Sequence, residues 1–192
     1  LSPRGTAGFV LANGSLTSNT TAEWEIRKNL VEADLVDCIV AMPEKLFFNT
    51  AIAVCLWFVS KDRNGNGHRR RRGEVLFINA EKMGTLVTKR LRELSATDIA
   101  KIANTYHSWR NHDGGYKDIP GFAKSVAVEE LRKNDFVLTP GRYVGTAAIA
   151  DDGEPVKKKI QRLAADLITE LDRGRKLENA IRARLADGSA IQ

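Results

Sequence analysis

The sequence is poor in the residues from which disulfide frameworks and metal sites are built. It has only two cysteines and three histidines, and it lacks the run of about 18 apolar residues that a membrane-spanning helix needs. Cys38 and Cys55 lie in apolar stretches without a second Cys or His at metal-ligand spacing. His68, His107 and His112 stand in polar surroundings without a triad or zinc pattern. We therefore expect two buried, reduced thiols, surface histidines, no metal and a cytoplasmic protein without a membrane segment.

Positive charge is concentrated in two segments of a chain whose formal net charge is +6. Residues 61–73 contain six basic residues and one acid, and residues 156–185 contain nine basic residues and four acids. A polyanionic partner would meet the chain at these segments. Residues 61–73 also have no apolar anchor, which predicts an exposed, mobile loop. Its candidate DNA-binding residues are Arg69, Arg70, Arg71 and Arg72; a solvated loop kept soluble by its charge is the alternative.

The first eighty residues predict a mixed α/β arrangement. Residues 22–32 have the pattern of a helix that Thr20 or Thr21 could cap. Four short apolar runs predict strands, the first of them buried and closed by a turn at Asn13–Gly14, over residues 8–12, 35–41, 52–60 and 74–79. The last two of these strands have no helix between them, which indicates the terminal part of a mixed sheet with an antiparallel pair at one edge.

The second half predicts further elements and then a separate helix. Ser95 to Asp98 resembles a capping box, so a helix should follow and run to about Trp109. A short strand is expected at residues 125–127, a helical turn at 128–133 and an extended stretch at 136–138. We interpret residues 139–143 as the exit from the compact domain.

From Pro155 onward, apolar residues recur at steps of three and four, which predicts one long helix with a single apolar stripe. About thirty residues make a helix roughly 45 Å long. Such a stripe packs either on the chain's own domain or on a helix of a partner. The residues expected to form it are Ile160, Leu163, Leu167, Leu171 and Ile181.

Several segments, in order, resemble those of one enzyme family. Residues 4–16, RGTAGFVLANGSL, with residues 25–30, EIRKNL, resemble the late sheet strand and helix of type I modification subunits. Residues 35–52, LVDCIVAMPEKLFFNTAI, resemble the adjoining strand, loop and strand of these enzymes. The order continues in residues 75–80, 94–106, 121–122 and 134–144. Over nearly its whole length the chain therefore resembles the C-terminal part of the modification subunit of a type I restriction-modification system, an N6-adenine DNA methyltransferase.

The resemblance implies an architecture and an activity. The fold would be α/β, the C-terminal portion of a Rossmann-like methyltransferase sheet with an antiparallel edge, followed by a long C-terminal helix. Residues 1–145 would belong to the methyltransferase domain, 146–154 to a linker and 155–192 to a helical subunit-docking tail. The parent enzyme would transfer a methyl group from S-adenosylmethionine to N6 of an adenine flipped out of the DNA duplex. Its partners would be DNA, a specificity subunit and a restriction subunit.

Two motifs that perform this chemistry in the family are absent. The Asn-Pro-Pro-aromatic motif needs consecutive prolines, and the five prolines here are all separated. The glycine motif for the cofactor should precede a helix, but the only Gly-x-Gly, Gly65-Asn66-Gly67, lies in the charged loop. We assign no catalytic residue and expect the chain to be a fragment that is inactive alone, with the cofactor site mostly outside it.

The resemblance assigns roles to two groups of residues. Phe47 matches the aromatic that holds the extruded base by stacking; the alternative is that Phe47 and the adjacent Phe48 belong to the core. The apolar stripe beyond Pro155 would dock on the specificity subunit. A function of a different class is also open, namely a stand-alone adaptor or DNA-binding module that kept this part of the fold. Against it, an isolated sheet edge would be uncovered and should promote self-association.

Overall fold

The computed structural model describes residues 1–146 and 156–186. The chain divides into two compact units, residues 1–148 and 149–192, and each is considered by itself. Except for its first residue, the predicted linker 146–154 lies outside the described residues. No helix in the described part of the chain is long and apolar enough to cross a membrane.

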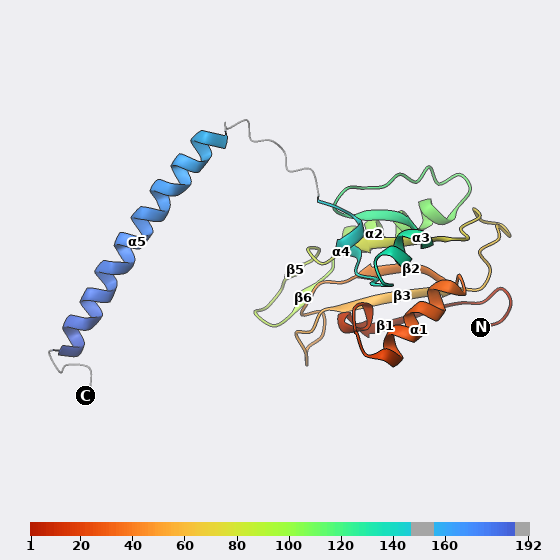
Figure 1. Cartoon of the computed structure of the whole chain (residues 1–192), viewed down its shortest axis with the longest axis horizontal. Helices are drawn as coiled ribbons and strands as arrows, with labels where there is room; N and C mark the ends of the chain where they lie inside the picture. Colours follow the sequence, from red (N-terminus) through yellow and green to blue (C-terminus); the bar gives the residue numbers. More distant parts are fainter. Residues whose placement is uncertain (147–155, 187–192) are drawn as a thin grey trace. The chain divides into compact units, whose positions relative to one another are not determined.

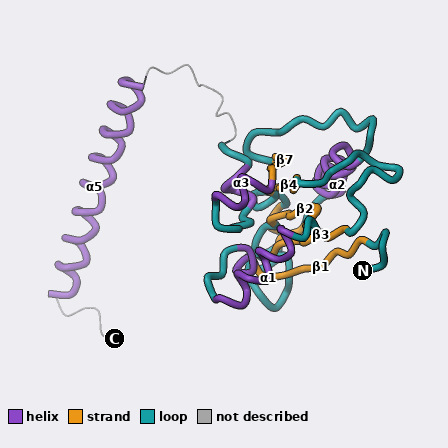
Figure 2. The backbone as a smooth tube through the Cα atoms, turned by 45° about the vertical axis from the view of Figure 1, so that its right-hand side comes forward, coloured by secondary structure: helices purple, strands orange, loops and turns teal. Residues whose placement is uncertain are grey.

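The first unit (Figure 1) is built on a five-stranded sheet of order β1-β3-β2-β4-β7, whose strands are all labelled in Figure 2. Its strands are β1 (Thr6–Ala12), β2 (Val36–Ala41), β3 (Val54–Ser60), β4 (Glu74–Asn79) and β7 (Ala123–Ala127). Only β2 and β4 are parallel; every other neighbouring pair is antiparallel. The mixed α/β sheet is confirmed. Antiparallel pairs, however, lie at both edges. At one edge β3 inserts between β1 and β2 instead of pairing with β4, and at the other β7 pairs with β4.

The first strand is not buried, contrary to its apolar sequence. Phe9, Val10 and Leu11 are exposed by 39%, 50% and 40%. β1 pairs with β3 on one side, and in the described part of the chain no strand pairs with its other edge. An apolar run identifies a strand but does not show whether the same chain covers it. In this chain, β1 is an uncovered edge strand.

Two layers of helix enclose the sheet (Figure 2). α1 (Thr21–Glu32), α3 (Val128–Lys133) and α4 (Pro140–Tyr143) contribute buried residues to one core cluster with Ile39 and Phe77. α2 (Ala96–Arg110) contributes Trp109 to a second cluster with Val40 and Ile78. Successive residues of a strand point to opposite faces, so the apolar runs at residues 38–41 of β2 and 75–78 of β4 supply both cores.

The predicted exit from the compact domain is wrong. Residues 140–143 form α4, in which Tyr143 is buried and its ring stacks on Phe77 with centroids 4.5 Å apart. The stretch before it is not simply extended, because Asp135 and Phe136 have positive φ angles of 53° and 54°. A Pro-Gly pair suggests a break in structure, but here the proline occupies the first turn of a short helix, where its missing N–H costs nothing.

Other local predictions hold. The capping box at the start of α2 is present: Ser95 Oγ accepts from the Asp98 amide at 3.1 Å, and the Asp98 carboxylate accepts from the Ser95 amide at 2.9 Å. Cys38 and Cys55 are buried and free. The hairpin of β5 (Thr85–Leu86) and β6 (Arg92–Glu93), which the sequence did not predict, precedes α2.

The second unit contains α5 (Val156–Ala186), one uninterrupted helix as the periodicity predicts. Charged pairs one turn apart run along it, such as Arg182 with Glu178 at 2.7 Å. Its stripe residues are 51–61% exposed, and they are Ile160, Leu163, Leu167, Leu171 and Ile181.

Candidate functional site

The loop that follows β2 carries the aromatic residues singled out by the sequence. After Ala41 the chain stays buried through Met42 and Pro43 and then reaches the surface. Phe47 and Thr50 form an isolated antiparallel bridge, which closes a tight turn. The carbonyl oxygen of Lys45 accepts a 2.7 Å hydrogen bond from the backbone of Arg92. The turn is therefore tied to the β5–β6 hairpin.

Neither phenylalanine of this turn belongs to the core. Phe47 is 44% exposed and Phe48 is 82% exposed, so the alternative that both are core residues is wrong. Burial of a large aromatic side chain is favourable, and an exposed one does not contribute this free energy to folding. An exposed aromatic face at the end of a strand offers a platform for a planar ring. Whether Phe47 stacks on a base stays a prediction.

Asn13 lies at the same end of the sheet, just after β1, and its backbone amide bonds to Ala53 O at 3.3 Å. Its Oδ1 atom is buried and finds no hydrogen-bond partner in the described part of the chain. A buried acceptor without a donor is costly, so this atom is suited to accept from a group outside the chain. Sequence reasoning gives Asn13 only a turn role, because an unpartnered amide is visible only in the tertiary structure.

The described residues contain no cluster of metal-ligating side chains, and the glycine pair at residues 65 and 67 does not form a cofactor cradle. Among them, no group of three or more His, Cys, Asp or Glu residues could hold a metal ion. Gly65 and Gly67 have positive φ angles of 98° and 77°, but they shape a turn between β3 and β4 and do not open a helix. The usual glycine cradle for a nucleotide cofactor needs a strand-turn-helix connection. These residues do not fit the cofactor.

A buried ion cluster occupies the opposite end of the sheet. Asp37, on β2, has a fully buried side chain, and its Oδ1 atom lies 3.1 Å from Nε of both Arg63 and Arg71. Its Oδ2 atom accepts a 2.7 Å hydrogen bond from the Tyr106 hydroxyl. Arg63 also pairs with Asp34, and its guanidinium donates to the carbonyl oxygens of residues 71 and 74. The cluster joins β2, α2 and the basic loop.

This cluster overturns the prediction that residues 61–73 form an exposed, mobile loop. Arg63 and Arg71 are only 2% and 1% exposed. Arg69 donates to Glu74 at 2.9 Å and to the Trp109 carbonyl oxygen at 2.8 Å. The sequence shows no apolar anchor because the anchor is electrostatic: arginines of the loop reach a carboxylate hidden on a strand.

The four arginines predicted to meet DNA therefore have different surroundings. Arg71 is buried, Arg69 is half-buried and Arg70 is exposed. Arg72 is 56% exposed and lies 3.3 Å from Asp34. Among the histidines, His107 and His112 are exposed as predicted, but His68, in this loop, is half-buried.

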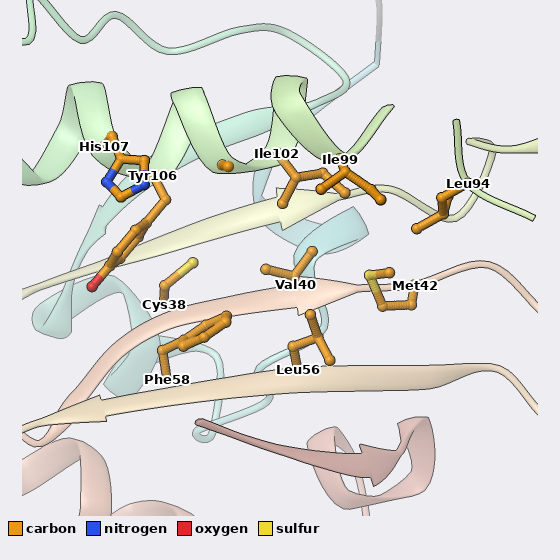
Figure 3. A pocket seen from close by; sticks show the side chains of 11 residues that line it. Cys38, Val40, Met42, Leu56, Phe58, Leu94, Ile99, Ile102, Tyr106 and His107 are labelled. Carbon is orange, nitrogen blue, oxygen red and sulfur yellow. The ribbon is translucent and has the colours of Figure 1, made fainter. Parts of the chain in front are cut away.

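An apolar cleft of about 440 Å³ lies between α2 and the sheet (Figure 3). Its lining includes Cys38, Phe58, Ile102 and Tyr106. Burial, with a smaller contribution from the Asp37 charge, raises the pKa of the Cys38 thiol well above its ordinary value. A thiol that stays protonated is a poor nucleophile. The Cys38 thiol is therefore a poor nucleophile at ordinary pH.

The class of protein follows from comparison with known families. The N-6 DNA Methylase family model matches residues 1–152. The matched residues contain the mixed sheet, the helices on both of its faces and the exposed loop at the carboxyl end of β2. The chain belongs to the N-6 DNA methylase family.

Particular relatives are subunits of type I restriction enzymes. The HindI methylase subunit of Haemophilus influenzae is 49% identical over 185 residues, which are 96% of this chain and 40% of that protein. The MjaIX methylase subunit of Methanocaldococcus jannaschii is 40% identical over 181 residues, 94% of this chain and 31% of that protein. The chain thus spans well under half of either relative.

Among solved structures, the type I restriction-modification methyltransferase subunit from Streptococcus thermophilus is 32% identical to the chain, with a TM-score of 0.61. The match covers 74% of this chain and 27% of that one. The resemblance found in the sequence and the fold found in the structure therefore agree.

Proposed function

We propose that this chain forms the C-terminal part of a type I modification subunit that transfers a methyl group from S-adenosylmethionine to N6 of adenine in DNA. The family match and the two methylase-subunit relatives support a methyltransferase role. One observation carries the local assignment. Phe47 is exposed in the loop after β2, where the family resemblance places the aromatic that stacks on the extruded base.

In this proposal the chain contributes binding and not the chemical step. Stacking of a base on an aromatic side chain is worth about 1–3 kcal/mol, which favours a flipped-out base without specifying sequence. The cofactor does not fit the described residues, so its site and the group that contacts N6 would belong to the remainder of a longer protein. The chain alone should therefore neither hold the cofactor nor methylate DNA.

The test is Phe47→Ala in a full-length subunit that contains this region. Methyl transfer to duplex DNA should fall by about tenfold or more, as expected for a lost stacking contact. The free energy of unfolding should change by less than about 0.5 kcal/mol, because the side chain is already half-exposed. Leu86→Ala, at a residue 51% exposed on β5, is the matched control and should retain activity.

Base extrusion can be followed directly with 2-aminopurine in place of the target adenine. The fluorescence increase on binding should shrink in Phe47→Ala and persist in the control. If activity and stability fall together, Phe47 is a packing residue and its assignment fails. If an intact gene product starting near this chain's first residues is stable and methylates nothing, the stand-alone adaptor function replaces the present one.

The second unit supports a subunit-docking role. The exposed stripe of α5 has the pattern of a helix that pairs with other helices, and both relatives are named as subunits of a larger enzyme. We assign this stripe to the specificity subunit, with the restriction subunit and DNA as further members of the complex. On the first unit, Arg70 and Arg72 are the two members of the arginine run that remain exposed enough to meet DNA phosphates.

A further inference from the structure

A small polar cleft lies beside the ion cluster, where β1 begins and β3 ends. Its volume is about 150 Å³, and Arg4, Ser60, Asp62, His68, Arg71 and Arg110 line it. At about 30 Å³ for each water in the liquid, this space equals about five waters. Pockets for drug-sized ligands begin at about 300 Å³. The cleft therefore admits a small ion or a single protruding group.

Two nitrogen atoms of the cleft residues lack partners. Nδ1 of His68 and Nε of Arg110 are buried atoms, and neither has a hydrogen-bond partner among the residues that the structure describes. Polar atoms removed from water are nearly always paired. A guanidinium can only donate, so the group that satisfies Arg110 must be an acceptor.

The charges around the cleft also favour a negative ion. In the neighbouring ion cluster, three arginines share two aspartates: Arg63, Arg71 and Arg72 pair with Asp34 and Asp37. In the cleft itself, Arg4 and Arg110 face a single carboxylate, that of Asp62. Each group thus carries one more positive than negative charge. Arg4 and Arg72 are exposed and keep their hydration, whereas Arg110 is half-buried, so an anion in the cleft would chiefly offset the charge of Arg110.

The pKa of His68 responds to the same excess of positive charge. Desolvation lowers it first, and the charges of Arg110 and Arg71 lower it further, with a smaller contribution from His112; a hydrogen bond with Asn111 opposes the shift. An anion in the cleft would offset these charges and favour the protonated imidazole. Binding of an anion should therefore raise the pKa of His68.

We propose that this cleft binds one tetrahedral oxyanion, a phosphate or sulfate group, held by Arg4, Arg110 and His68. The site is separate from the Phe47 loop. β3 runs from the end of the sheet that carries the loop to Ser60 at the cleft, seven residues or roughly 20 Å away. The inference does not depend on methyl transfer. The oxyanion would come from a DNA backbone phosphate or from a free anion.

The first experiment titrates the 192-residue chain with sulfate, which stays dianionic across the pH range, and follows the imidazole signals of His68 by NMR. Sulfate should shift these signals saturably and raise the pKa of His68. Arg110→Gln and Arg4→Gln should each weaken binding about tenfold, the effect of losing one charge-assisted hydrogen bond. Arg90→Gln is the matched control, because Arg90 is also an arginine, is exposed and does not line the cleft. It should bind like the wild type.

A short DNA duplex then distinguishes the two sources. If the ligand is a backbone phosphate, the duplex shifts His68, sulfate competes with it, and Arg110→Gln reduces the salt dependence of DNA binding by about one phosphate contact. If the ligand is a free anion, sulfate shifts His68 and the duplex does not. The proposal is overturned if sulfate leaves His68 unchanged, or if Arg4→Gln and Arg110→Gln bind sulfate as the Arg90→Gln control does.

Discussion

Tyr106 on α2 donates its hydroxyl proton to Asp37 on β2 at 2.7 Å, and the same carboxylate holds Arg63 and Arg71 through its other oxygen. One buried side chain thus joins a helix, a strand and a loop whose sequence carries no apolar anchor. The hydrogen bonds satisfy the carboxylate on both sides, which is the condition under which a buried charge is tolerated.

Asp37→Asn should destabilise the first unit strongly. The substitution keeps the size of the side chain but leaves the Arg63 and Arg71 guanidiniums, both at most 2% exposed, without their shared counterion. Removing one partner of a buried pair costs about 3–5 kcal/mol. Urea unfolding followed by tryptophan fluorescence measures the loss. Asp113→Asn, at an exposed acid, should change stability little; equal midpoints for the two variants would show that the cluster contributes no net stability.

Tyr106 should make the protein sensitive to alkali. Burial, followed by the nearby charge of Asp37, raises the pKa of Tyr106 well above its ordinary value of 10.0. Above about pH 10 the unfolded chain loses this proton while the folded chain keeps it, so the free energy of unfolding falls as pH rises.

Tyr106→Phe has no such proton. Between pH 10 and 11.5 its free energy of unfolding should therefore fall less steeply than that of the wild type, by up to about 1.4 kcal/mol per pH unit. At pH 7 the variant should be less stable by about 1.5–3 kcal/mol, because a hydrogen bond to a charged group is lost. Urea titrations at several pH values give both quantities. Parallel pH profiles for variant and wild type would contradict the assignment.

The uncovered edge of β1 should make the isolated chain self-associate. Its free backbone groups and exposed apolar side chains form a template for another strand. Val10→Lys, at a residue 50% exposed, should reduce association in sedimentation velocity runs at increasing concentration. Val87→Lys is the matched control, since Val87 is 56% exposed but lies outside the sheet edge. A wild-type chain that stays strictly monomeric at high concentration would refute this prediction.

Leu167→Lys should prevent assembly with the specificity subunit. Leu167 is 61% exposed in the stripe of α5, and a lysine there places a charge in the surface proposed to be buried on docking. Co-purification of the two subunits measures assembly, and thermal unfolding of the first unit should be unchanged. Gln161→Lys, outside the stripe, serves as the control. Assembly that survives Leu167→Lys would show that the stripe docks elsewhere.

Local patterns identified most of the elements. The capping box at Ser95, the helical turn at 128–133 and the period of α5 follow from contacts between residues close in sequence, and the strand at residues 74–79 follows from its local apolar, β-branched composition. The family resemblance likewise rests on ordered segments, and the comparisons agree with it. The short β5–β6 hairpin escaped prediction because strands of two residues carry no periodic signal.

The sequence by itself determined the type of each long element, the reduced state of the thiols and the family. Only the tertiary structure decided that β1 is exposed, that Pro140 and Tyr143 are buried and that Arg71 is buried while Arg70 is not. These outcomes depend on partners distant along the chain, such as Asp37 for Arg71. A run of arginines has the same sequence whether its side chains are solvated by water or paired with a buried carboxylate. Folding brings the Asp37 carboxylate within 3.1 Å of the Arg71 guanidinium.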